Sequence, residues 1–302
     1  MISDSVNVHA ETRAGQSHQA ELPDAYWDMD IQSNPSLLDV NFRELWRYRD
    51  LLFLIVRRDF VAAYKQTVLG PIWHLTEPLV TTLTYAFIFG LVANISTDGL
   101  PRILFYLPGI TLWMFFSNTL IHVAGTFNAN AGVFGKVYFP RLVVPIAMVC
   151  TNLIALGLQF VMFVVLILVY YLSGVNVQVT PYALCTPLLV LMVGGLALGL
   201  GMLLSSVTTR YRDLQKLVQV TMRLMMFGTP IIYPLSKVSE QYQWIIRLNP
   251  MTPLVETFRY VWLGTGVFSW GNMFYSATIM LVSLVWGGLV FNRAEKVAMD
   301  SV

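Results

Sequence analysis

The sequence predicts an all-α integral membrane protein with six membrane-spanning helices. Hydrophobic residues make up 56% of the chain and charged residues only 12%, against roughly 25% charged residues in a soluble domain. The charges are also unevenly placed, since ten of the seventeen acidic residues precede Phe60 and only five lie between Phe60 and Phe291. Long uncharged tracts are what a bilayer requires, because a spanning helix needs about 20 apolar residues.

Six tracts are long and apolar enough to span a membrane. They are expected at Trp73–Ala93, Ile103–Ala124, Leu142–Leu172, Tyr182–Val207, Leu214–Tyr233 and Asn272–Phe291. The third is longer than a bilayer requires, so it is expected to tilt or protrude. Pro108-Gly109 is expected to break or kink the second, because proline removes an intrahelical hydrogen bond. Gly195 and Gly199 of the fourth form a GxxxG pair, which predicts close helix packing.

The distribution of lysine and arginine predicts that both termini face the cytoplasm. Loops on the predicted cytoplasmic side contain thirteen of these residues, and loops on the other side contain four, namely Arg102, Lys237, Arg247 and Arg259. Short cytoplasmic loops are enriched in these bases. Residues 1–40 are polar and acidic and lack an apolar signal segment, so a disordered cytoplasmic tail is expected there. Residues 293–302 are expected to form a cytoplasmic C-terminal tail.

Residues 41–70 predict an amphipathic helix before the six-span domain, which is expected at 71–292. Apolar residues recur there at steps of three and four, at Phe53, Val56, Phe60, Tyr64 and Val68. Such a helix either lies in the cytoplasmic interface with its aromatic face among lipid headgroups, or packs against the bundle, and the two arrangements are compatible. Gly70-Pro71 is expected to turn the chain into the first span.

The segment between the fifth and sixth expected spans is too polar to span and too apolar for an ordinary loop. Pro250 and Pro253 divide it into two short amphipathic pieces, near Gln241–Leu248 and Leu254–Leu263. Two short half-buried helices at the outer interface, acting as a gate, fit this pattern.

Motifs for ATP binding, metal binding and covalent catalysis are absent from the sequence. There is no G-x-x-x-x-G-K-[ST] phosphate loop. The four histidines are scattered and give no metal-ligand spacing. Cys150 and Cys185 lie in apolar tracts and are interpreted as small buried hydrophobic residues. The sequence therefore favours a transport subunit, without a cofactor or metal of its own, over an enzyme.

One stripe of the fifth expected span is polar at close to helical spacing. It consists of Arg212, Gln215, Gln219, Arg223 and Phe227. Such a stripe is typical of a wall that faces a water-filled path, where the guanidinium of Arg223 would bind a phosphate with bidentate geometry. The alternative is an arginine that extends toward the cytoplasmic surface, which leaves the two glutamines unexplained.

Five short stretches occur together in the order and topological positions of one family. They are RRDFVAAYKQTVLGPIW, GKVYFPRLVVP, TRYRDLQKLVQ, GTPIIYPLS and LNPMTPLVETFRYVWLG. Together they resemble the membrane subunits of ABC exporters of the polysaccharide and polyol-phosphate class, which export O-antigen, capsule and teichoic acid polymers. The resemblance covers residues 41–292.

The resemblance implies a homodimer of six-span subunits bound to a homodimer of separate ATPase subunits, which hold the ATP and Mg²⁺. It implies export of a polysaccharide on undecaprenyl diphosphate, similar to an O-antigen, from the cytoplasmic side across the bacterial inner membrane. The expected partners are therefore the ATPase, the lipid-linked polymer and membrane lipids, and not nucleic acid.

Three groups of site residues follow from the motifs and the resemblance. Substrate is expected to enter beside Arg57, Arg58, Tyr64, Lys65, Arg210 and Arg212. Coupling to the ATPase is expected at Val133, Phe134, Lys136, Tyr138 and Phe139. Most aromatic side chains in membrane helices pack or face lipid, but a minority stack on sugars. The candidates for a substrate channel are Tyr85, Phe89, Trp113, Phe116, Gln219, Arg223, Phe227 and Tyr233.

Three other functions fit part of the pattern. They are an exporter of the same architecture for a small drug or glycolipid, a secondary transporter that works alone, and an intramembrane enzyme. Neighbouring genes for glycosyltransferases would argue against the first, and an adjacent ATPase gene would exclude the second.

Overall fold

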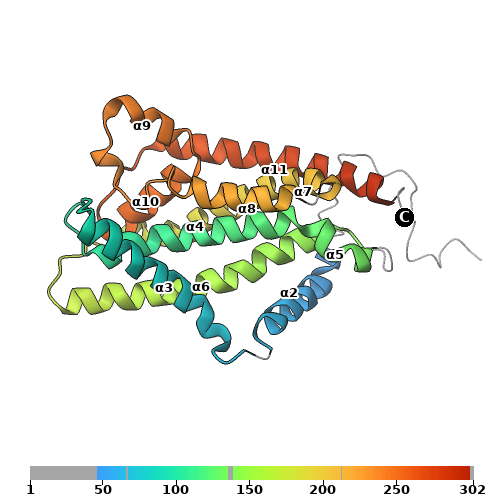
Figure 1. The fold of residues 1–302 in the computed structure, drawn as a ribbon, viewed down its shortest axis with the longest axis horizontal. Coiled ribbons are helices and arrows are strands. Elements are labelled where there is room, and N and C mark those ends of the chain that lie inside the picture. Colours follow the sequence, from blue (N-terminus) through green and yellow to red (C-terminus); the bar gives the residue numbers. More distant parts are fainter. Residues whose placement is uncertain (1–45, 66, 135–138, 212, 300–302) are drawn as a thin grey trace, which may run out of the picture. The chain divides into compact units, whose positions relative to one another are not determined.

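A computed structural model describes residues 46–65, 67–134, 139–211 and 213–299 and confirms the all-α class for them. Every regular element in these ranges is a helix, and they contain no strand. The long helices run alongside one another (Figure 1). α9 (Glu240–Arg247) and α10 (Met251–Leu263) lie at one end of the bundle, called the α10 end, and α5 (Thr126–Phe134) lies at the other, called the α5 end.

Five helical segments of the described residues are long and apolar enough to cross a membrane, and they match five expected spans. The first, Gly70–Val92, combines η2 (Gly70–Ile72), α3 (Trp73–Tyr85) and the π-helical η3 (Ala86–Val92). The others are α4 (Arg102–Ala124), α6 (Val143–Leu172), η4 (Pro181–Cys185) with α7 (Thr186–Arg210), and α11 (Trp270–Met299). α11 continues into the expected C-terminal tail, while the expected tail 1–40 lies outside the described residues.

The fifth expected span, Leu214–Tyr233, is not a continuous helix, so a sixth spanning helix is not confirmed. α8 (Leu214–Met225) ends after 12 residues, which corresponds to about 18 Å of helix. The hydroxyl of Thr229 donates a hydrogen bond to the Met225 carbonyl, and Pro230 has no N–H with which to continue the helix. The chain therefore completes its course from the α5 end to the α10 end through a non-helical turn.

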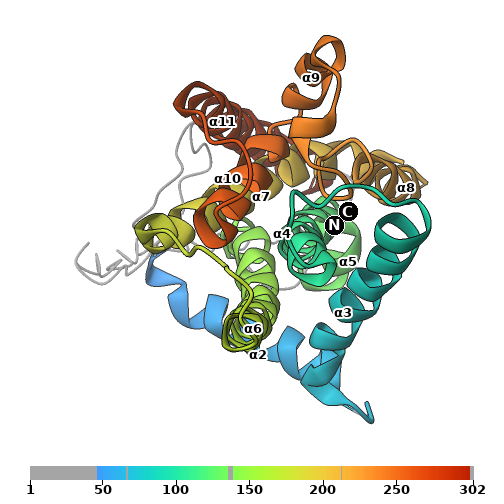
Figure 2. The same ribbon diagram turned by 90° about the vertical axis from the view of Figure 1, so that its left-hand side faces the viewer.

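α4 is the central helix of the bundle and is surrounded by the others (Figure 2). It contacts α3, α6, α7, α8 and α10. It runs unbroken through Pro108 and Gly109, so of the predicted break or kink the break does not occur. A β-carbon at Gly109 would lie 3.1 Å from the Ile231 side chain and 3.2 Å from that of Arg259. The glycine thus serves the close approach of other segments to α4.

α2 (Arg49–Tyr64) packs against α6, which confirms the bundle-packing alternative. Ile55 and Val56 are buried in a cluster with residues at the start of α6. Phe53 is 68% exposed, as a side chain that faces lipid headgroups would be, whereas Val68 lies beyond the end of the helix, so the expected apolar stripe is wrong at Val68. Gly70 has a φ of 52° and begins η2, which confirms the predicted turn.

The two short helices after α8 form where they are expected, but they are not both half-buried. After η5 (Leu235–Lys237), α9 exposes most of its side chains, including the aromatic ring of Trp244. α10 is instead buried along nearly its whole length and contacts α4, α7 and α11. The prediction of half-burial is therefore wrong for α10, because periodicity alone does not show which neighbours cover a helix, and for α9 it stays a prediction.

α7 and α11 pack closely at glycine, which confirms the prediction from the GxxxG pair. A β-carbon at Gly195 would lie 2.8 Å from the sulfur of Met280, and one at Gly199 would lie 2.6 Å from the backbone nitrogen of Leu284. Nothing lies within 4 Å of the corresponding position at Gly288.

These two glycines give a matched test of this packing. Gly199→Ala is expected to lower the free energy of unfolding by roughly 1–3 kcal/mol, because the new methyl group meets backbone rather than a flexible side chain. Gly288→Ala is expected to be neutral or stabilising by up to about 1 kcal/mol, from the helix preference of alanine. Thermal unfolding of the purified variants in detergent measures both, and equal shifts in the same direction would contradict the packing.

Candidate functional site

The predicted channel residues lie on α3, η3, α4, α8 and the turn after α8. α4 contacts both α3 and α8, and Figure 2 shows these two helices on the same side of it. The ring of Tyr85 packs edge-on against Phe89 with centroids 5.3 Å apart. The Tyr85 hydroxyl lies 3.6 Å from the sulfur of Met226, so the first span touches the end of α8.

These residues differ in their exposure. Trp113 and Phe116 are buried in the core, with ring centroids 5.4 Å apart. Gln219 is half-buried, Arg223 is exposed, and Phe227 is 51% exposed. We call the surface formed by Gln219, Arg223 and Phe227 the α8 face. It contains an amide, a guanidinium and an aromatic ring.

Tyr233 is held near the α8 face by its own hydroxyl group. This half-buried residue donates a hydrogen bond of 3.1 Å to the carbonyl of Phe227. The bond closes the turn after α8, so the orientation of the last channel candidate depends on the non-helical course of this segment.

The expected substrate-entrance residues lie at α2 and at the end of α7. Arg57, Arg58 and Lys65 are exposed, and Arg58 forms an ion pair with Asp59 at 2.8 Å. Arg210 is the last residue of α7. Arg212 lies outside the described residues.

Tyr64 marks a hollow between α2 and α3. Its ring packs edge-on against His74 with centroids 5.3 Å apart. The hollow has a volume of about 550 Å³, and Tyr64, Trp73, His74 and Glu77 are among the residues that line it. The stretch RRDFVAAYKQTVLGPIW, which contains Tyr64 and Trp73, therefore borders a recess with both polar and aromatic walls.

The expected coupling residues lie in and after α5. Val133 and Phe134 are its last two residues, Phe139 is buried in the cluster between α2 and α6, and Lys136 and Tyr138 lie outside the described residues.

α5 is attached to the bundle by specific contacts. The side chain of Asn128 donates a hydrogen bond of 3.1 Å to the carbonyl of Thr208, and the ring of Phe127 stacks on Phe291 with centroids 4.7 Å apart. A displacement of α5 therefore acts directly on α7 and α11.

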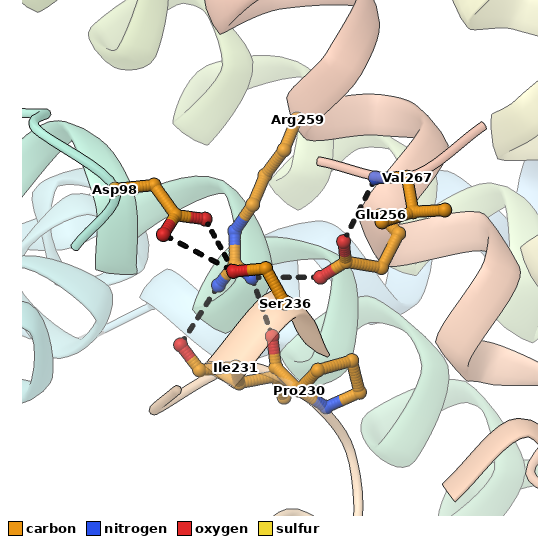
Figure 3. A network of polar contacts seen from close by, with 7 residues as sticks. All are labelled: Asp98, Pro230, Ile231, Ser236, Glu256, Arg259 and Val267. Carbon is orange, nitrogen blue, oxygen red and sulfur yellow. Dashed lines mark hydrogen bonds and ion pairs between the residues drawn. The ribbon is translucent and has the colours of Figure 1, made fainter. Parts of the chain in front are cut away.

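A buried polar network lies at the α10 end (Figure 3). The side chain of Arg259 is 1% exposed. Its guanidinium donates hydrogen bonds to the carbonyls of Pro230 and Ile231, the second at 2.8 Å, and lies 3.3 Å from a carboxylate oxygen of Glu256. The network thus ties α10 to the turn that follows α8.

Further contacts surround the ion pair between Arg259 and Glu256. The second oxygen of Glu256 accepts the N–H of Val267 at 3.1 Å, and the guanidinium lies 3.9 Å from the ring centroid of Phe105, a cation–π contact. Nearby, the hydroxyl of Ser236 donates to Asp98. Burial lowers the pKa of Arg259 to about 10, with Glu256 acting in the opposite direction, so the guanidinium stays charged at neutral pH.

This network is not apparent from the sequence, in which Arg259 is one base of an expected outer loop. The available signal was the spacing. Glu256 and Arg259 are three residues apart and therefore share a helix face, and they are flanked by apolar residues on both sides.

Fold and site together define a multi-pass, all-helical membrane protein, built on a central buried helix with a short buried helix at one end. Residues 50–263 match the family model for the ABC-2 type transporter. This match covers more than half of the chain, and the protein therefore belongs to the ABC-2 type transporter family.

Several relatives match along most of their length. The chain is 28% identical over 248 residues to the O-antigen export system permease protein RfbA of Klebsiella pneumoniae, covering 82% of this chain and 92% of the relative. It is 30% identical over 219 residues to RfbA of Myxococcus xanthus, covering 72% and 82%. It is 24% identical over 256 residues to the polysialic acid transport protein KpsM of Escherichia coli, covering 83% and 95%.

Replacing the buried guanidinium tests its role in the fold. Arg259→Met is expected to lower the free energy of unfolding by about 3–5 kcal/mol, because Glu256 is left buried without its partner. Arg259→Lys is expected to restore only part of this loss, since an ammonium lacks the planar fork of donors. Thermal unfolding in detergent measures both variants. The control is Arg247→Met on α9, where the arginine bonds to Gln243 in the same helix, and an equal effect there would contradict this role.

Proposed function

We propose that this chain is the permease subunit of an ATP-driven exporter that moves a polysaccharide linked to undecaprenyl diphosphate from the cytoplasmic side across the bacterial inner membrane. The observation that carries the proposal is the match, over 82% of this chain and 92% of the relative, to a permease named for O-antigen export. The relative named for polysialic acid transport matches over a similar share. Movement of a carbohydrate polymer is what these names have in common.

Six crossings of the membrane place both termini in the cytoplasm in this proposal. Five crossings are the long helices, and the remaining one is α8 together with the turn that follows it. α7 ends at the α5 end, where Thr208 bonds to Ala124, whereas α11 starts at the α10 end, where Ser276 bonds to Pro250. The excess of bases near the α5 end supports a cytoplasmic position for it.

Two copies of the chain associate across the α8 face in this proposal and enclose the path of the polymer. A charged side chain exposed to hydrocarbon is costly, and Arg223 is exposed on a helix that lies within the bundle. A second copy would cover this surface and leave the guanidinium facing a hydrated path. The rings of Tyr85 and Phe89, on the neighbouring helix, would offer apolar faces on which sugars slide, without a fixed set of hydrogen bonds.

Energy for export would come from a separate ATPase dimer that contacts α5. The sequence contains no phosphate loop of its own, and the contacts of Asn128 with Thr208 and of Phe127 with Phe291 connect α5 to two long helices. The hollow beside Tyr64, with Arg57 and Arg58 exposed on the adjoining helix, would receive the diphosphate linker.

Depletion of the protein in its host tests the proposed cargo. Long polysaccharide on a polyprenyl diphosphate carrier is expected to accumulate in the inner membrane and to face the cytoplasm, because synthesis continues while export stops. Extraction and mass analysis of lipid-linked glycans measure it. Intact surface glycans without accumulation would instead indicate an exporter of a small drug or a glycolipid.

Arg223→Ala tests the α8 face. Export is expected to slow by roughly tenfold, the effect of losing one charge-assisted hydrogen bond to phosphate, while assembly with the ATPase is retained. The appearance of polymer at the cell surface after induction measures the rate, and co-purification measures assembly. Arg293→Ala, which removes an exposed guanidinium from α11, is the control, and the same export rate in both variants would contradict the proposed path.

A further inference from the structure

An apolar groove of about 830 Å³ lies between α6 and α7, with α4, α10 and α11 contributing to its lining. These helices lie on a different side of α4 from α8 (Figure 2). Its floor is buried and aromatic, with side chains of Phe115, Phe163 and Phe258. Its rim is exposed and aliphatic, with Leu184 89% exposed and Leu191 63% exposed. The groove is therefore open along the side of two membrane-spanning helices.

The polar groups that line the groove are already bonded within the protein. The hydroxyl of Thr186 donates to the carbonyl of Ala183 at 2.6 Å and accepts the indole N–H of Trp262 at 2.8 Å. The hydroxyl of Thr111 donates to the carbonyl of Pro108. No charged side chain is among the described residues that line the groove. The chemistry of the lining thus fits hydrocarbon and offers nothing to a headgroup, a nucleotide or a sugar.

The length of the groove is close to the thickness of the hydrocarbon core. Its lining on α6 extends from Ile146 to Phe163, which is about 26 Å at the helical rise, against roughly 30 Å for the core. An acyl chain that enters from one leaflet can therefore lie along the groove.

We propose that this groove binds a fatty acyl chain of a bilayer phospholipid. A space of this size left empty would forfeit dispersion contacts along its aromatic floor, and its apolar lining excludes ordered water. The open rim at hydrocarbon depth gives acyl chains from the surrounding leaflet direct access. The proposal concerns the protein in its membrane and does not rest on which substrate is exported.

The bound chain packs against α10. Phe258 and Trp262 are four residues apart and share one face of this helix, and both line the groove. Glu256 and Arg259 lie on another face, which the polar network holds. The acyl chain thus packs against one face of α10, and the guanidinium of Arg259 holds another face of the same helix.

Gly157 provides a means to fill the groove without disturbing the fold. It lines the groove on α6, and nothing lies within 4 Å of a β-carbon built there. Gly157→Phe would place a ring in the space that the chain occupies, while Gly157→Ala would leave the groove open. Ile154→Phe adds the same ring to α6 at an exposed position outside the groove lining and is the matched control.

The test uses the full chain in vesicles of phosphatidylethanolamine and phosphatidylglycerol that contain a phosphatidylethanolamine with a photoreactive acyl chain. Cross-linking, followed by peptide mapping, is expected to label the groove residues Leu153 and Val190 more strongly than the exposed Leu168, which lies outside the groove. In Gly157→Phe this labelling is expected to fall about tenfold, because losing contact with even two methylene groups weakens binding by that factor. Gly157→Ala and Ile154→Phe are expected to retain it.

Three outcomes would overturn the proposal. The first is equal labelling inside and outside the groove, unchanged in Gly157→Phe. The second is displacement of the labelled phospholipid by a low mole fraction of polyprenyl phosphate, which would assign the groove to a polyisoprenoid chain. The third is cross-linking of Leu153 to a second copy of this chain, which would make the groove a protein interface. Thermal unfolding of Gly157→Phe distinguishes loss of binding from loss of fold.

Discussion

The guanidinium of Arg259 satisfies backbone carbonyls that the interrupted course of α8 leaves outside any helix, and the architecture of the α10 end depends on this interaction. Polar backbone groups at membrane depth need partners from the protein itself, because hydrocarbon offers none. Arg259 donates to Pro230 and Ile231 at once, Glu256 balances its charge, and the missing side chain at Gly109 leaves room for it. A buried ion pair is not in itself strong evidence for stability, but here each partner also bonds to backbone.

The two ends of the bundle are connected through α4. This helix contacts α5 at one end, and at the other it carries Phe105, whose ring lies under the guanidinium of Arg259. α7 runs beside it and meets α11 at Gly199, where no side chain separates the two backbones. Closely packed helices move as units rather than deforming continuously. A displacement imposed on α5 therefore reaches the α10 end through rigid elements, as the proposed coupling to an ATPase requires.

The sequence alone predicts the long helices well, because hydropathy and length decide them. Ile103–Ala124 and Leu142–Leu172 differ from α4 and α6 by one residue at their starts. Prediction from the sequence fails where contacts with a neighbouring segment decide the structure. Pro108 lies inside a helix whose neighbours cover it. The tract Leu214–Tyr233 is expected to span, yet its helix ends at Met225. α10 is buried despite its charges. The predicted site residues on α8 and α3 lie on the same side of α4. Arg259, by contrast, matters because it bonds to carbonyls almost thirty residues earlier in the chain, and helical periodicity does not predict such a contact.

α10 is held on one face by the protein and lies open to the bilayer on another, and both contacts bear on its proposed role as a gate. A 13-residue helix is too short to span, so contacts on its faces, rather than the thickness of the membrane, fix its depth. On one face those contacts are directional, since the hydrogen bonds of Arg259 to two carbonyls allow little sliding. On the face of Phe258 and Trp262 they are apolar and adaptable, because hydrocarbon packs without a preferred direction. The proposed gate would need one contact that fixes the position of the helix and another that yields without leaving a void, and the two faces of α10 would supply them.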